Sequence, residues 1–228
     1  MGYLLLAGGA EFGGQMSEVD ARAIELAGGL DTPICIIPTA AAPDDNHQRA
    51  GNHGIRWFRS VGSKNVFSVD VIDAASANDR SLAASIRTSR LIYLPGGFPR
   101  HLGETLANSV CWQAVLDVYQ QGGVIAGSSA GAMVLCEHYY DPHEKKLLRG
   151  LNLIPNACVL PHHNEFGKAW AGQLARLLPD ATLIGIDEYT GMLTDMDGGW
   201  QVHGEGTVTL YRSGSSICYG SGERCSFS

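Results

Sequence analysis

Short runs of apolar residues alternate along this chain with amphipathic helical patterns. Uninterrupted apolar runs predict strands that are buried on both faces, as in parallel sheets covered by helices. The first run ends at the Gly8-Gly9 turn. The later runs occupy residues 34–38, 65–71, 90–94, 123–126, 157–160 and 182–186. Helical patterns begin at residue 17, include Ile55, Phe58 and Val61, and continue at 101–107, 110–119 and 169–178. The repeated strand–helix order predicts an α/β fold, a doubly wound, mostly parallel sheet with helices on both faces.

The pattern changes after residue 191. Short alternating segments follow there, separated by the glycine-containing turns 197–199, 213–214 and 220–222. Alternation with such turns predicts antiparallel hairpins that close one edge of the sheet. The length of 228 residues suits one domain, 1–228, because that much chain can bury a continuous core.

Composition and charge narrow the classes of partner. Apolar residues make up 45% and charged residues 17% of the chain, as in globular proteins, and the net charge is −7. An acidic surface argues against nucleic-acid partners and acidic membranes, so we expect small molecules or peptides. The first residues lack a basic region, and no apolar run is long enough to span a bilayer.

Six cysteines are scattered without any Cys-x-x-Cys pair, so we expect no metal and no cofactor. Reduced thiols suit a cytoplasmic protein, although a bridge between Cys218 and Cys225 stays open. The edge strands and the C-terminal hairpins leave room for a homodimer contact, which one sequence does not decide.

The most informative segment is Gly127-Ser128-Ser129-Ala130-Gly131, which follows the apolar strand 123–126 and opens a helix of small residues. Gly-x-Ser-x-Gly between a strand and a helix is typical of a nucleophile elbow. Glycines let the backbone turn sharply, so the middle serine, Ser129, projects where free N–H groups favour an oxyanion. The same pattern also occurs as a plain turn or a phosphate cradle.

Three further strand ends carry the other parts of an acyl-transfer site. Gly96-Gly97 follows one strand, His162-His163 follows a second and Asp187-Glu188 follows a third. The carboxyl ends of parallel strands meet at one edge, where a serine nucleophile needs a base and a group that orients the base. Taken alone, Gly96-Gly97 is equally typical of a turn, His162-His163 of a solvated pair and Asp187-Glu188 of a polar strand exit. Together with the elbow they favour catalysis.

At these positions the chain resembles peptidase family S51, which includes aspartyl dipeptidase and cyanophycinase and has the class I glutamine amidotransferase-like fold. The resemblance rests on the elbow, on Leu94-Pro95-Gly96-Gly97, on Leu160-Pro161-His162-His163 and on residues 185–190. It implies a serine peptidase that cleaves small peptides in an exopeptidase-like way through an acyl-enzyme.

Carried over by motif, the resemblance makes Ser129 the nucleophile, His162 the base and Glu188 the orienting acid. The backbone amides of Gly97 and Ala130 would bind the oxyanion. His163 competes with His162, which we prefer because a glycine, here Gly167, follows the family's histidine by five residues.

The chain departs from the family around the substrate. Phe98-Pro99 stands where the family has polar residues, and Asn164 to Lys168 replaces the arginine-rich turn of cyanophycinases. The candidate substrate-binding residues are therefore Phe98, Arg100, His163 and Lys168, although Arg100 is equally suited to capping or solvating the following helix. The preferred side chain, and the choice between α- and β-linked bonds, stay open.

Two other classes of function compete with a peptidase. An α/β-hydrolase esterase places its acid before its histidine, an order that Ser129, Asp195 and His203 would satisfy. A non-catalytic binding or regulatory protein would keep the pocket without the chemistry. A glutamine amidotransferase is disfavoured, because that chemistry uses a cysteine at the elbow.

Overall fold

The computed structural model describes residues 1–195 and 197–227. Its centre is an eight-stranded sheet with the strand order β14-β11-β10-β1-β5-β4-β2-β3. Five neighbouring strands are parallel, namely β1 (Tyr3–Ala7), β5 (Val124–Ser128), β4 (Leu91–Leu94), β2 (Ile34–Ile36) and β3 (Val66–Ser68). Beyond β1, antiparallel strands extend the sheet, namely β10 (Thr190–Thr194), β11 (Trp200–Gly204) and β14 (Arg224–Cys225).

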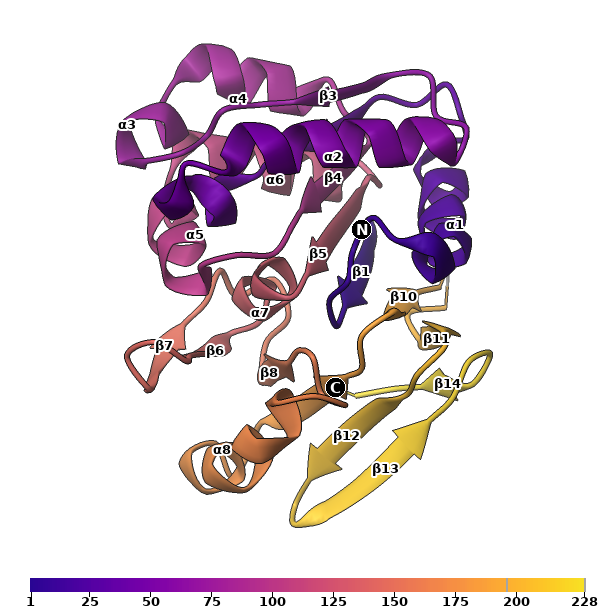
Figure 1. Ribbon diagram of the computed structural model, residues 1–228, viewed down its shortest axis with the longest axis vertical. Helices are drawn as coiled ribbons and strands as arrows, with labels where there is room; N and C mark the ends of the chain where they lie inside the picture. Colours follow the sequence, from indigo (N-terminus) through magenta and orange to yellow (C-terminus); the bar gives the residue numbers. More distant parts are fainter. Residues whose placement is uncertain (196, 228) are drawn as a thin grey trace.

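Helices cover both faces of this sheet because its central strands are apolar on both sides (Figure 1). Leu5 and Ala7 of β1 belong to one core cluster, which also holds apolar residues of α1 (Ser17–Ala27) and α2 (His47–Ser60). Leu4 and Leu6 belong to the opposite cluster, which holds residues from α3 (Ala74–Ala77), α4 (Arg80–Arg87), α5 (Pro99–Leu106), α6 (Val110–Gln120) and α7 (Ala130–Leu135). Two 3-10 turns, η1 (Gly14–Met16) and η2 (Thr39–Asp44), follow β1 and β2.

A second sheet of four strands has the order β13-β12-β9-β8. Its parallel pair is β8 (Ala157–Leu160) and β9 (Thr182–Ile186), and its antiparallel strands are β12 (Val208–Arg212) and β13 (Ser215–Tyr219). The connection from β8 to β9 forms η3 (Gly167–Trp170) and α8 (Ala171–Leu177), which lies beside β12 and β13 in Figure 1. A separate hairpin joins β6 (His138–Asp141) to β7 (Lys146–Arg149).

The predicted fold class is confirmed: the structure is an α/β fold with a large, mostly parallel sheet, helices on both faces and antiparallel C-terminal strands. The expectation of one sheet is wrong in one respect, because β8 and β9 pair with β12 and not with the main sheet. Strand pairing between distant segments leaves no local trace in an apolar run, so the sequence pattern did not separate the two sheets. The α4 helix and the β6–β7 hairpin were also not predicted.

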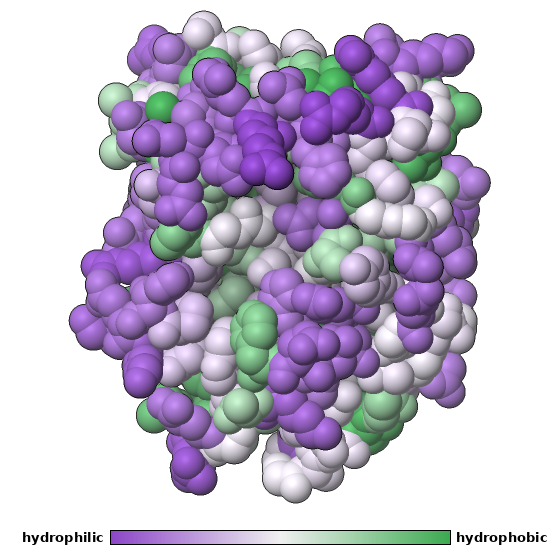
Figure 2. Space-filling view, in the orientation of Figure 1, coloured by the Kyte–Doolittle hydropathy of each residue, from purple (hydrophilic) through white to green (hydrophobic). Residues whose placement is uncertain are grey.

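Hydrophilic side chains cover much of the surface that Figure 2 shows. Within residues 1–195 and 197–227, no helix combines the length and the apolar character needed to cross a membrane. Figure 2 shows one face of the molecule, where hydrophilic side chains dominate and hydrophobic ones gather only in small patches.

Candidate active site

The carboxyl end of β1 connects the segments that carry the predicted triad. The carbonyl of Ala7 accepts a hydrogen bond from the Ser129 N–H at 3.0 Å, and the carbonyl of Gly8 accepts one from the His162 N–H at 2.8 Å. A Cβ on Gly8 would stand 2.2 Å from the Asp187 carbonyl oxygen, and a Cβ on Gly9 would stand 2.3 Å from the His162 ring. These two glycines therefore let the strand ends converge, because any side chain there would push them apart.

Ser129 lies in a strained turn between β5 and α7. Its backbone angles, φ 48° and ψ −112°, are unusual for a residue with a side chain. The glycines on either side permit this turn. A Cβ on Gly127 would approach the Gly131 backbone to 2.5 Å, and one on Gly131 would approach the Leu94 carbonyl oxygen to 1.9 Å. This is the geometry of the predicted nucleophile elbow.

The side chains of Ser129, His162 and Glu188 form a continuous chain. Ser129 Oγ lies 2.9 Å from His162 Nε2, and His162 Nδ1 lies 2.6 Å from Glu188 Oε1. Both imidazole nitrogens are thus engaged, one by a hydroxyl and one by a carboxylate that can keep the proton on Nδ1. The exposed Phe166 ring stacks on the His162 ring with centroids 4.9 Å apart. The arrangement can transfer a proton from Ser129 to a base that is already oriented.

The predicted oxyanion donors lie beside this chain. Gly97 has φ 140°, and a Cβ there would stand 2.3 Å from the Ala40 carbonyl oxygen, so this loop position requires glycine. Ala130 begins α7 directly after Ser129. No hydrogen bond engages the N–H of Gly97 or of Ala130 within the described part of the chain. Both donors are therefore available to an incoming carbonyl oxygen.

His163 occupies a different position from His162, whose backbone has left the strand conformation and has φ 46°. It is buried, with Nδ1 3.3 Å from Asp187 Oδ1 and Nε2 2.8 Å from the Tyr211 hydroxyl. The second Asp187 oxygen accepts hydrogen bonds from both the N–H and the hydroxyl of Thr207. Burial lowers the pKa of His163, and the neighbouring Asp187 opposes that change. His163–Asp187 thus forms an inner pair behind the outer pair His162–Glu188.

The other residues predicted to bind substrate have separate surroundings. The Phe98 ring stacks on His143 with centroids 5.2 Å apart. Arg100 forms ion pairs with Glu104, at 2.7 Å, and with Glu144. Lys168 lies exposed on η3. Their roles in substrate binding stay predictions.

A cleft of about 520 Å³, which we call the Gly96–Gly97 cleft, is lined by Gly97, one of the two predicted oxyanion donors, but not by Ser129 or His162. Its lining includes Glu11, Phe12 and Phe98, together with Arg49 and Arg56 of α2. Sequence reasoning did not single out Glu11, although its carboxylate bonds to Gly96 and to Ser128 next to the nucleophile. The sequence pattern predicts only a turn at Gly8-Gly9. Two glycines at the end of a buried strand were the available signal for the close approach seen here.

The residues of the alternative esterase set are not brought together with Ser129. Asp195 follows β10 near the beginning of β1, whereas Ser129 follows β5 at the end of β1. The five residues of β1, at about 3.3 Å each, separate these two ends. His203 lies on β11, two strands away from β1, and its Nδ1 is 3.3 Å from Glu18.

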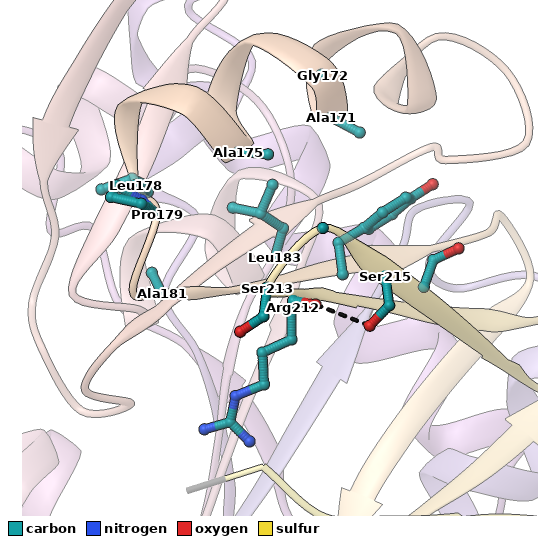
Figure 3. A pocket seen from close by; sticks show the side chains of 13 residues that line it. Ala171, Gly172, Ala175, Leu178, Pro179, Ala181, Leu183, Arg212, Ser213 and Ser215 are labelled. Carbon is teal, nitrogen blue, oxygen red and sulfur yellow. Dashed lines mark hydrogen bonds between the residues drawn. The ribbon is translucent and has the colours of Figure 1, made fainter.

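A second pocket of about 300 Å³ lies between α8 and the β12–β13 hairpin (Figure 3). Its wall is formed mainly by small and apolar residues, including Ala171, Ala175 and Leu183. Ser129, His162 and Glu188 do not line it. Tyr211, which lines this pocket, contacts His163 through its hydroxyl.

An open α/β sheet whose central strand leads into a strained serine elbow defines a class: α/β proteins with a nucleophile elbow at the carboxyl edge of a parallel sheet. The chain belongs to peptidase family S51, which residues 4–198 match. It is 30% identical over 226 residues to the cyanophycinase of Synechococcus elongatus, covering 92% of this chain and 67% of that protein. The cyanophycinase of Geminocystis herdmanii is 29% identical, with 95% and 82% covered.

Two solved structures are similar to this chain. A peptidase from an acI-B1 Actinobacterium superposes with a TM-score of 0.89 at 30% identity, covering 100% of this chain and 97% of that one. A putative peptidase E from Listeria monocytogenes has a TM-score of 0.61 at 18% identity, with 96% and 98% covered, and therefore shows a likeness of fold alone. The family makes this protein a peptidase.

Proposed function

We propose that this peptidase is a serine-type enzyme that cleaves amide bonds of small peptides in an exopeptidase-like way. The observation that carries the proposal is the chain of contacts from Ser129 Oγ through His162 to Glu188, at 2.9 Å and 2.6 Å. Both distances lie within the range for a nucleophile–base pair and a base–orienter pair. The cleft of about 520 Å³ beside Gly97 suits a short peptide rather than a folded protein.

In the proposed reaction, His162 Nε2 accepts the hydroxyl proton while Ser129 Oγ attacks the carbonyl carbon of the amide. The N–H groups of Gly97 and Ala130 donate hydrogen bonds to the oxyanion of the tetrahedral intermediate. As the C–N bond breaks, His162 returns the proton to the leaving amine, and an acyl-enzyme remains. Water then attacks the ester, again with His162 as base, and releases the acid.

Glu188 acts through His162, because its carboxylate keeps the imidazole in the tautomer that presents an unprotonated Nε2 to Ser129. The six cysteines are free thiols, five of them buried, which supports a reducing, cytoplasmic setting for the enzyme. The resemblance to a family that includes aspartyl dipeptidase suggests aspartyl-containing peptides as substrates to include in a first panel.

The test is labelling of Ser129 by a fluorophosphonate, followed by turnover of a dipeptide library. We expect wild-type protein to label, and Ser129→Ala to lose labelling and at least about 10⁴-fold in turnover. Ser60→Ala is the matched control, because Ser60 is exposed at the end of α2 and bonds only to its own helix. A folded wild-type protein that neither labels nor cleaves any dipeptide would refute the proposal and favour a binding protein.

A further inference from the structure

The carboxylate of Glu11 lies at the edge of the Ser129 site, held by two of the loops that build it. The Gly96 N–H donates to Oε1 at 2.7 Å, and the Ser128 hydroxyl donates to Oε2 at 2.8 Å. A Cβ on Gly96 would stand 3.1 Å from Oε1 and 3.2 Å from Ser129 Cβ. Only the narrow Gly96 backbone therefore lies between this carboxylate and the nucleophile.

The backbone around Glu11 is unusual on both sides. Ala10 has φ 55° and Phe12 has φ 61°, left-handed values that side chains disfavour. Phe12 is buried, and its ring packs against Phe58 and Tyr93 with centroids 6.2 Å and 5.1 Å away. The core thus holds the loop in a strained shape that directs Glu11 toward the site, as strained residues at functional sites often do.

The charge of Glu11 is not balanced by an ion pair in the described part of the chain. Within residues 1–195 and 197–227, no Lys, Arg or His side chain forms an ion pair with it, although Arg49 and Arg56 line the same cleft. A fixed negative charge beside Gly97 opposes the oxyanion that the proposed reaction creates. A cation that binds to Glu11 while the reaction proceeds would offset this repulsion.

We propose that this cation is the free α-ammonium group of the substrate's N-terminal residue, so that the enzyme cleaves the first peptide bond of a short peptide. The inference rests on the proposed serine chemistry and names the group that recognises the substrate. Each carboxylate oxygen accepts one hydrogen bond from the protein and keeps a free lone pair. An ammonium group offers three donors and forms strong, charge-assisted bonds to such oxygens.

The covalent geometry of a peptide fits this placement. Only two bonds of about 1.5 Å each separate the α-nitrogen from the carbonyl carbon that Ser129 attacks. In the proposed complex, that carbon lies at Ser129 Oγ, its oxygen lies on the Gly97 and Ala130 amides, and the α-nitrogen is directed toward Gly96 and Glu11. A substrate whose α-nitrogen is acylated offers one neutral N–H there, so it leaves the carboxylate unneutralised. N-blocked peptides and internal bonds are thereby excluded.

The test compares free and N-acetylated versions of aminoacyl-7-amido-4-methylcoumarins with acidic, basic and apolar side chains. For wild type we expect acetylation of the best substrate to lower kcat/KM by at least about 100-fold, as expected when a charged contact is lost. Glu11→Gln keeps the size but removes the charge: its amide oxygen can accept from the Gly96 N–H, and its amide N–H can donate to the Ser128 hydroxyl. The acetylation effect should therefore fall below about 5-fold. Glu25→Gln, an exposed change on α1, is the control and should keep the wild-type ratio.

Fluorophosphonate labelling separates this inference from the serine chemistry on which it rests, because the probe carries no ammonium group. Glu11→Gln should label at least as fast as wild type. Wild type that labels but shows no acetylation effect, or cleaves no free-amine substrate, overturns the role of Glu11 alone. The role of Glu11 is also overturned if Glu11→Gln keeps the wild-type ratio of kcat/KM between free and acetylated substrates. If Glu11→Gln fails to fold, the test uses Glu11→Asp, which withdraws the carboxylate by one methylene. This variant must then lower the ratio of kcat/KM between free and acetylated substrates.

Discussion

Asp20 is a carboxyl group in the core of the protein, and it makes stability depend on pH. It lies on α1 with no exposed surface, and its Oδ2 accepts a 2.7 Å hydrogen bond from the Trp57 indole N–H. Its Oδ1 has no hydrogen-bond partner within the described residues. Burial raises the pKa of Asp20 from 3.8 to about 7, the Trp57 bond opposes this, and the negative charge of Glu11 adds to it.

The sign of the effect follows from proton binding. Between pH 3.8 and about 7 the folded protein holds a proton on Asp20 that the unfolded chain has released. Unfolding therefore releases a proton in this range, and the Asp20 contribution to the free energy of unfolding falls as pH rises. At 1.36 kcal/mol per pH unit, the loss from below pH 3.8 to above pH 7 is about 4 kcal/mol. The contribution is fully present below pH 3.8 and absent above about pH 7.

Asp20→Asn removes this titration while keeping the shape of the side chain. The assay is urea denaturation of wild type and variant at several pH values between about 4 and 8. We expect the free energy of unfolding of the variant, minus that of wild type, to increase with pH by about 4 kcal/mol across this range. Asp180→Asn, which changes an exposed carboxyl group, should give a difference that does not vary with pH. A difference for Asp20→Asn that varies by less than about 0.5 kcal/mol would refute the reasoning.

Two further predictions concern the geometry of the site. Gly9→Ala places a Cβ 2.3 Å from the His162 ring at a φ of 141°, so the ring must leave Ser129 and kcat should fall by at least about 100-fold. Gly172→Ala is the control, because open space surrounds Gly172, and it should not change kcat. A Gly9→Ala protein with wild-type kcat would contradict the packing argument. Tyr211→Phe removes the hydroxyl that bonds to His163 at 2.8 Å. Thermal denaturation should show that the variant is about 1 kcal/mol less stable than wild type. An unchanged melting temperature would mean that the His163–Asp187 pair does not depend on Tyr211.

The local parts of the site were accessible from the sequence because their causes are local. Gly127 to Gly131 encodes a sharp turn between a strand and a helix, and the structure confirms the unusual backbone of Ser129. The apolar runs located the strands, so the segments after 160 and 186 were expected to hold side chains at a sheet edge. The choice between His162 and His163 was less accessible, because both follow the same strand and residue types alone do not reveal which faces Ser129.

What the amino-acid pattern determined by itself was the fold class, the elbow and the strand ends, since these depend on periodicity and on glycine conformations over a few residues. Only the tertiary structure placed β8 and β9 in a second sheet and joined their ends to β1 through Gly8 and Gly9. Only it brought Glu11 to Gly96 and Ser128, which lie 85 and 117 positions further along the chain. The physical reason is that such contacts are set by packing between distant segments, and no short stretch of residues records which partners that packing will bring together.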